Sequence, residues 1–119
     1  MVQTFNRQAD AKATKVLDLV HCDLAGPITP QSREGMKYSI CFADDYTGIL
    51  TVYFLKNKSE AVKATEKFIT DFSIYGKIKV LRSDNGTEFM NKSFEELMIK
   101  NKIKHLTSAP YSPHQNGTV

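Results

Sequence analysis

The chain has 119 residues, a length with room for one hydrophobic core and not for two. Apolar residues make up 41% and charged residues 24%, proportions that exclude wholesale disorder, and no apolar run approaches the roughly 18–20 residues of a membrane helix. Sixteen basic and thirteen acidic residues give a net charge of +3, which permits a nucleic-acid partner without requiring one. Two cysteines cannot form a disulfide framework and no secretory signal is visible. We therefore expect an intracellular protein that is not secreted and has no membrane partner.

The first elements of the chain are predicted to be strands. Residues 1–15 are weakly patterned and are expected to form a lead-in to a single domain at 16–119. Branched aliphatic and aromatic residues predict strands at 16–24, 38–43 and 49–55. Between the last two, Asp44, Asp45 and Gly48 are typical of a hairpin turn.

The hydrophobic period then changes from that of strands to that of helices. Ser59 is the expected N-cap of a helix that should end at Gly76, and a second helix is expected to begin near Asn91. Short strands are predicted at 77–82 and 103–107, and two prolines and a glycine exclude regular structure from 109–117. Three strands followed by helical crossovers predict an α/β fold, a mixed five-stranded sheet with flanking helices.

Two aspartates, Asp23 and Asp84, are the first candidates for chemistry, because each interrupts or ends an apolar strand. A carboxylate in such a place is costly to bury unless it is paired, hydrogen-bonded or bound to a metal. If the two strands are neighbours, both carboxylates can share a hard divalent cation, Mg²⁺ or Mn²⁺, which prefers oxygen ligands. The alternative is structural: each aspartate caps a turn, at 26–27 and at 85–86.

Four segments that follow one another in order narrow this interpretation. They are HCDLAGP at 21–27, FADDY at 42–46, SDNGTEF at 83–89 and APYSPHQNG at 109–117. Each is weak alone, but together they resemble the integrase catalytic core of copia-type LTR retrotransposons, a branch of the retroviral integrase family. The resemblance covers residues 13–119 and implies a ribonuclease H-like fold, whose last helix would be missing from these residues.

The resemblance also implies an activity. Members of this family hold divalent metal ions with two aspartates and a glutamate, and Asp23 and Asp84 match the two aspartates. Two such ions can activate an attacking hydroxyl and stabilise the leaving oxygen in a phosphodiester displacement. By resemblance, the expected cofactor is Mg²⁺ or Mn²⁺, the reaction is strand transfer, and the partners are element ends and target DNA. The expected location is the nucleus or a cytoplasmic particle.

The third carboxylate of the family falls outside the printed residues. By resemblance it is expected at position 120, one residue past Val119, so the 119 residues are expected to bind metal weakly and to be inactive alone. Glu88 belongs to the same motif as Asp84, so we do not expect it to be a relocated third ligand. It either supports the site through hydrogen bonds or is a solvated residue before the second helix.

Other interpretations stay open. His114, Gln115 and Asn116 resemble the loop that approaches DNA in the family, or they form an exposed polar loop. The chain is either an integrase core fragment or a non-catalytic module, derived from a transposon, that binds nucleic acid or self-associates as a homodimer. A zinc site is not expected, because the histidines and cysteines lack the paired spacing of zinc ligands.

Overall fold

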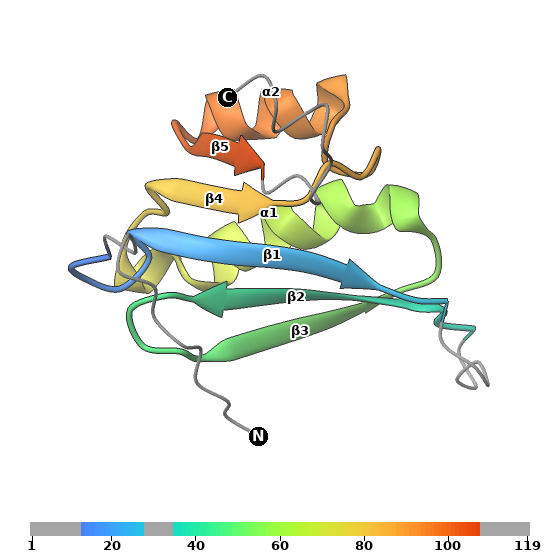
Figure 1. The fold of residues 1–119 in the computed structure, drawn as a ribbon, viewed down its shortest axis with the longest axis horizontal. Coiled ribbons are helices and arrows are strands. Elements are labelled where there is room, and N and C mark those ends of the chain that lie inside the picture. Colours follow the sequence, from blue (N-terminus) through green and yellow to red (C-terminus); the bar gives the residue numbers. More distant parts are fainter. Residues whose placement is uncertain (1–12, 28–34, 108–119) are drawn as a thin grey trace, which may run out of the picture.

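The fold is seen in a computed structural model (Figure 1), which describes residues 13–27 and 35–107. Five strands form one sheet: β1 (Leu19–Ala25), β2 (Tyr38–Asp44), β3 (Leu50–Leu55), β4 (Val80–Ser83) and β5 (Lys104–Thr107). The helices of these ranges are α1 (Ala61–Asp71), α2 (Lys92–Lys100) and two short 3₁₀ helices, η1 (Lys58–Glu60) and η2 (Ser73–Tyr75). None of these helices is long and apolar enough to cross a membrane.

The sheet is mixed, and its strand order is β3-β2-β1-β4-β5. β1, β2 and β3 pair antiparallel, whereas β4 pairs parallel with both β1 and β5. Parallel neighbours need crossover connections, which α1 provides before β4 and α2 before β5. The predicted α/β class and the mixed five-stranded sheet are therefore confirmed.

Both helices pack on the same face of the sheet. One buried cluster joins alternate residues of β1 and β2, such as Val20 and Phe42, to Phe68 of α1 and Phe94 of α2. The rings of Phe42 and Phe68 stack with centroids 4.4 Å apart. Burial of each such side chain contributes roughly 1.5–3 kcal/mol. In Figure 1, α1 lies behind the sheet, so the face toward the viewer carries no helix of the described ranges.

The predicted start of the first strand was wrong. Leu17 has a φ of 71°, a left-handed conformation that interrupts a strand. Its N–H donates a hydrogen bond of 2.7 Å to Asp44 Oδ1 at the hairpin turn. This contact bends the chain before Leu19, where β1 begins.

The other boundaries were predicted in part. Ser59 is not the N-cap, because helical structure already begins with η1 after Asn57, whose N–H donates to Glu60 Oε1 at 3.3 Å. Gly76, with a φ of 135°, ends the helical segment as predicted, but it follows η2 rather than α1 directly. Asn91 is the N-cap of α2, and its Oδ1 accepts the N–H of Phe94 at 2.9 Å.

Candidate metal site

The two candidate aspartates lie at corresponding places along neighbouring strands, Asp23 within β1 and Asp84 directly after β4. β1 and β4 are parallel, and their register pairs His21 with Arg82. Asp23 and Asp84 each lie two residues further along, toward the carboxyl ends of the strands. Asp23 is exposed and Asp84 is half-buried, so both remain accessible to solvent. The condition on which the sequence-based interpretation depended, that the two strands are neighbours, is met.

The Asp84 carboxylate is held by the turn that follows β4. Its Oδ1 accepts the N–H of Gly86 at 2.8 Å, so Asp84 caps the turn at 85–86 as the structural alternative predicted. Its Oδ2 has no hydrogen-bond partner in the part of the chain that the structure describes. Asp23 lies inside β1, and its side chain forms no hydrogen bond or ion pair with a described residue. The turn thus orients Asp84 and leaves carboxylate oxygens of both residues available.

A partly buried contact that the sequence did not predict connects Ser83, the residue before Asp84, to β5. Ser83 Oγ lies 2.7 Å from Nε2 of His105 and 3.0 Å from the backbone oxygen of Asp84. Because a hydroxyl has a single proton, donation to the Asp84 carbonyl leaves Ser83 to accept the N–H of His105. Burial lowers the pKa of His105 and thereby favours the neutral ring, although the charge of Glu95 acts in the opposite direction.

Negative charge is concentrated around the end of β1. Burial raises the pKa of the Cys22 thiol well above 9.0, and the carboxylates of Asp23, Asp84 and Glu88 raise it further. Cys41 lies opposite Asp23 on β2, and burial together with that carboxylate raises its pKa as well. Both thiols therefore stay protonated at neutral pH and do not present the thiolates that zinc prefers. A hard cation, in contrast, prefers carboxylate oxygens such as those of Asp23 and Asp84.

Glu88 lies against the turn at 85–86. A Cβ added at Gly86 would collide with the Glu88 carboxylate, so the absence of a side chain at Gly86 is what admits it. The carboxylate is half-buried and forms no hydrogen bond with a described residue. It therefore adds charge to the site without bonding to Asp84. Within 13–27 and 35–107, no three His, Cys, Asp or Glu side chains converge as a ready metal-ligand set.

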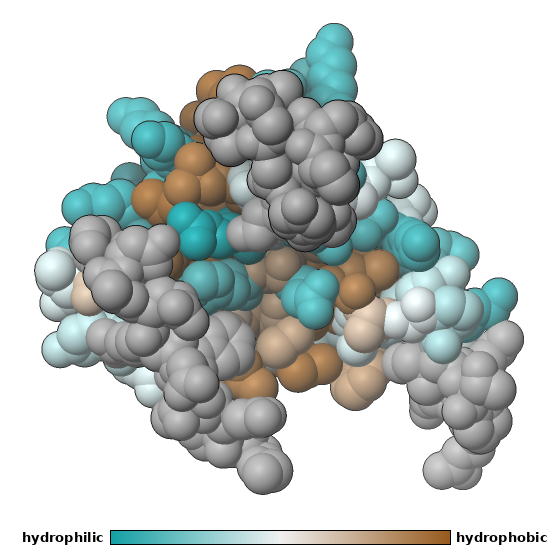
Figure 2. Space-filling view, in the orientation of Figure 1, coloured by the Kyte–Doolittle hydropathy of each residue, from teal (hydrophilic) through white to brown (hydrophobic). Residues whose placement is uncertain are grey.

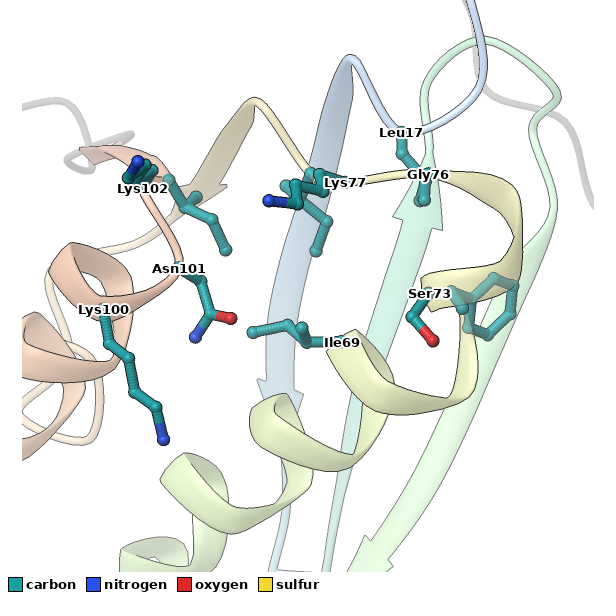
Figure 3. Close-up of a pocket in the computed structure, with 11 residues that line it drawn as sticks. Leu17, Ile69, Ser73, Gly76, Lys77, Lys100, Asn101 and Lys102 are labelled. Carbon is teal, nitrogen blue, oxygen red and sulfur yellow. The ribbon is translucent and has the colours of Figure 1, made fainter.

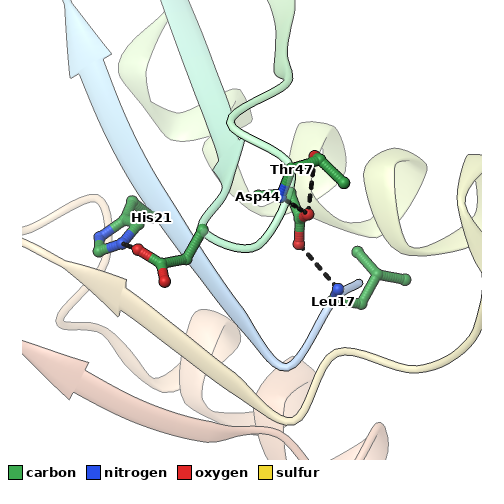
Figure 4. A network of polar contacts seen from close by, with 5 residues as sticks. Leu17, His21, Asp44 and Thr47 are labelled. Carbon is green, nitrogen blue, oxygen red and sulfur yellow. Dashed lines mark hydrogen bonds and ion pairs between the residues drawn. The ribbon is translucent and has the colours of Figure 1, made fainter. Parts of the chain in front are cut away.

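The hairpin aspartates do more than form a turn (Figure 4). Asp44 is buried, and its Oδ2 accepts hydrogen bonds from both the N–H and the hydroxyl of Thr47, at 2.9 and 2.8 Å. Its Oδ1 accepts the hydrogen bond from the N–H of Leu17. Asp45 Oδ1 lies 3.1 Å from Nε2 of His21 on β1. These contacts bind β1 to the hairpin and thereby support the strand that carries Asp23.

The residues predicted to contact DNA, His114, Gln115 and Asn116, lie outside the described residues.

The fold and the site together define the class of protein: an α/β domain with an acidic site at the carboxyl ends of two neighbouring parallel strands. Residues 13–113 match the family described as "Integrase core domain". The chain belongs to the integrase core domain family, and the resemblance inferred from the four motifs is confirmed.

The relatives that the chain matches are much longer polyproteins. It is 38% identical over 104 residues to the retrovirus-related Pol polyprotein from transposon TNT 1-94 of Nicotiana tabacum, a match that covers 86% of this chain and 8% of the polyprotein. With the Pol polyprotein from transposon RE1 of Arabidopsis thaliana it shares 31% identity, over 92% of this chain and 7% of the relative. The chain thus spans less than a tenth of the length of these relatives.

Solved structures of integrases have the same fold. A chain of the simian T-cell lymphotropic virus intasome, in complex with the PP2A regulatory subunit B56 gamma, has a TM-score of 0.69 and 17% identity, over 90% of this chain and 40% of that one. The dimeric form of the HTLV-2 integrase catalytic core domain, in complex with magnesium, has a TM-score of 0.63 and 22% identity, over 89% of this chain and 68% of that one. The predicted ribonuclease H-like fold is therefore confirmed.

Proposed function

We propose that the chain is the catalytic-core portion of a retrotransposon integrase, in which Asp23 and Asp84 together bind Mg²⁺ or Mn²⁺ for phosphodiester strand transfer on DNA. The observation that supports this proposal is the corresponding placement of Asp23 within β1 and of Asp84 directly after the parallel neighbour β4. The HTLV-2 core, which shares the fold, is described in complex with magnesium.

The residues of this chain would act mainly by holding and orienting the cation. Asp84 Oδ2 and the exposed carboxylate of Asp23 are the available ligands, and the bond from Gly86 keeps the Asp84 carboxylate in one orientation. Glu88 would attract the cation through its charge without coordinating it. A cation held by these residues would supply activation of an attacking hydroxyl and stabilisation of the leaving oxygen.

Metal binding by this pair predicts a thermal stabilisation that both aspartates are needed to produce. With a dissociation constant of about 1 mM, 10 mM Mn²⁺ should stabilise the fold by about 1.4 kcal/mol and raise the melting temperature by about 5 °C. The double variant Asp23→Asn, Asp84→Asn should show no such rise when followed by differential scanning fluorimetry.

A matched control removes two acids elsewhere. Glu66 and Glu96 are exposed on α1 and α2, and the variant Glu66→Gln, Glu96→Gln should respond to Mn²⁺ like the unchanged chain. An equal rise of the melting temperature in the aspartate double variant would show that the cation binds elsewhere, and the proposed site would then be abandoned.

We further propose that two carboxylates are too few for strand transfer, so that the 119 residues alone do not join DNA. The assay is Mn²⁺-dependent joining of labelled oligonucleotides, performed on the 119 residues and on a chain extended to a carboxylate at position 120. Joining by the 119 residues that Asp84→Asn abolishes would contradict this part of the proposal.

DNA binding without joining should weaken steeply as the salt concentration rises, because contacts to phosphates release counterions.

A further inference from the structure

A cavity of about 240 Å³ lies at the end of the sheet opposite Asp23 and Asp84. Its walls come from the segments that lead into β1, β4 and β5 and from the carboxyl-terminal parts of α1 and α2. The apolar part of the lining, which we call the floor, consists of Leu17, Ile69, Phe72, Ile78 and Ile103. Figure 3 shows Ile69 and Asn101 pointing toward one another across the cavity. We refer to it as the amino-end cavity.

Backbone strain is concentrated around this cavity. Only two non-glycine residues within the described ranges have a positive φ, Leu17 at 71° and Lys102 at 57°, and both line it. Such conformations crowd the Cβ atom against the following carbonyl oxygen. Strained residues persist where the surrounding structure holds them, and they cluster at binding sites.

Lys102 shows the strain most clearly. It follows the last residues of α2 in a motif that satisfies the helix end: its N–H donates to Ile99 O at 3.1 Å, and the Ile103 N–H donates to Met98 O at 2.9 Å. Glycine is strongly favoured at this position of the motif, because it adopts a positive φ without penalty. A glycine would therefore end the helix without this strain, although the helix dipole also favours a cation at this end.

The polar rim of the cavity is positively charged. Lys77 and Lys102 line it and form no ion pair with a described residue. Lys100 also lines it, but in Figure 3 its ammonium group points away along α2. Lys100 lies in the last turn of α2, where the helix dipole favours a cation, whereas Lys77 belongs to no helix. The dipole thus accounts for Lys100 and leaves Lys77 unexplained.

We propose that the amino-end cavity binds a short acidic segment of a partner protein, which inserts one apolar side chain onto the floor while its carboxylates contact Lys77 and Lys102. The apolar floor and the unpaired lysines are complementary to both parts of such a segment. Phosphates of a nucleic acid would meet the lysines but leave the half-buried floor residues Ile69 and Phe72 uncovered. Phe72, the aromatic ring in the lining, is already stacked on Phe68 at 4.5 Å and does not offer that face to a base. This proposal does not depend on the metal site.

The test uses a fluorescein-labelled peptide of sequence Glu-Glu-Leu-Glu-Glu, titrated with the 119-residue chain and followed by fluorescence anisotropy. The double variant Lys77→Glu, Lys102→Glu should bind at least about tenfold more weakly, because attraction becomes repulsion. A peptide with alanine in place of leucine should also bind about tenfold more weakly, because it buries less apolar surface of its own and of Ile69 and Phe72. Amide chemical shifts should change around the cavity.

A matched control reverses two charges away from the cavity. Lys63 and Lys92 are exposed in the first turns of α1 and α2, at the helix ends opposite the cavity, and the variant Lys63→Glu, Lys92→Glu should bind the peptide within about twofold of the original chain. If this control weakens binding as much as Lys77→Glu, Lys102→Glu does, the interaction depends on net charge only and the site is wrong.

The variant Lys102→Gly separates binding from stability. Glycine removes the strain at φ 57°, so the melting temperature should stay equal or rise while peptide affinity falls by about threefold. A lower melting temperature with unchanged affinity would mean that Lys102 is structural, and the proposal would fail. It would fail equally if duplex DNA displaced the peptide and shifted the same amides, since the occupant would then be a nucleic acid.

Discussion

Asp44 connects two parts of the chain that are distant in sequence. Its carboxylate accepts two hydrogen bonds within the hairpin turn, from Thr47, and one from Leu17 ahead of β1. The sequence indicated only the turn, because the spacing from Asp44 to Gly48 is local. The bond to Leu17 spans 27 residues and depends on how β1 lies beside β2.

Replacement of Asp44 by alanine is expected to be strongly destabilising. The change removes three hydrogen bonds to a buried charged group and leaves the Leu17 N–H without its partner, which should lower the free energy of unfolding by about 3 kcal/mol. Thr47→Val keeps the bond from the Thr47 N–H but removes the hydroxyl bond to Asp44 and the exposed bond that the hydroxyl accepts from the Ile49 N–H. It should lower the free energy of unfolding by about 1 kcal/mol. Urea denaturation measures both, and equal losses would contradict the role given to the Leu17 contact.

His105 makes stability depend on pH in a defined direction. Its pKa in the folded protein lies below 6.5 because the ring is partly buried. The unfolded chain therefore takes up the proton more readily, so the contribution of the neutral ring is complete above pH 6.5 and is lost as the pH falls toward the folded pKa.

The variant His105→Gln should remove this dependence while retaining a donor for Ser83. Between about pH 7.5 and about pH 5.5, the original chain should lose more unfolding free energy than the variant does. Urea denaturation at the two pH values gives the comparison, in which all other titrating groups are common to both chains. Identical losses would mean that His105 does not titrate as its burial implies.

At the scale of elements, Asn91 joins α2 to the turn after β4. Its Oδ1 caps the helix through Phe94, and its Nδ2 donates to the backbone oxygens of Thr87 and Glu88 at 2.8 and 3.2 Å. The sequence predicted that the helix begins near Asn91, because an N-cap signal is local. The additional bonds to the turn link the position of α2 to the segment that follows Asp84.

Asn91→Ala is therefore expected to lower the free energy of unfolding by about 1–2 kcal/mol. Asn91→Ser keeps a side-chain acceptor for the Phe94 N–H but not the two bonds from Nδ2. Its free energy of unfolding should therefore fall by only about half as much as that of the alanine variant. Chemical denaturation of the two variants gives the test. If serine performs no better than alanine, the cap contributes nothing and the contact with the turn accounts for the whole effect.

At the scale of the whole molecule, the two faces of the sheet differ. The face behind β1 to β5 in Figure 1 is covered by α1 and α2, whereas on the other face hydrophobic side chains reach the surface (Figure 2). On the edge strand β3, the exposed fractions of Val52 and Phe54 are 45% and 60%. An exposed apolar edge strand favours pairing with another chain. We propose that self-association of the chain uses this edge.

The variant Val52→Thr, Phe54→Thr keeps residues suited to a strand and removes the apolar surface. It should reduce concentration-dependent self-association in sedimentation velocity while the melting temperature changes little. Ile99→Thr is the control, because Ile99 is 70% exposed on α2 and lies on a different element. Unchanged association of the β3 variant would show that the edge strand is not the contact.

The sequence by itself determined the features that depend on neighbouring residues. The strands at 38–43 and 49–55, the turn between them and the start of α2 were predicted correctly, because alternation, capping and turn chemistry act over a few residues. The family that the motifs indicated was predicted correctly as well. Ser59 was misplaced as an N-cap because Asn57, two residues earlier, competes for the same role.

Only the tertiary structure decided which distant residues meet. The sequence marked Asp23 and Asp84, but their equivalent positions follow from the parallel register of β1 and β4, strands that α1 and two other strands separate along the chain. The contact between Ser83 and His105, the bend at Leu17 and the amino-end cavity likewise need strand order and helix placement. The physical reason is that such contacts depend on how elements pack, and local propensities carry no information about that packing.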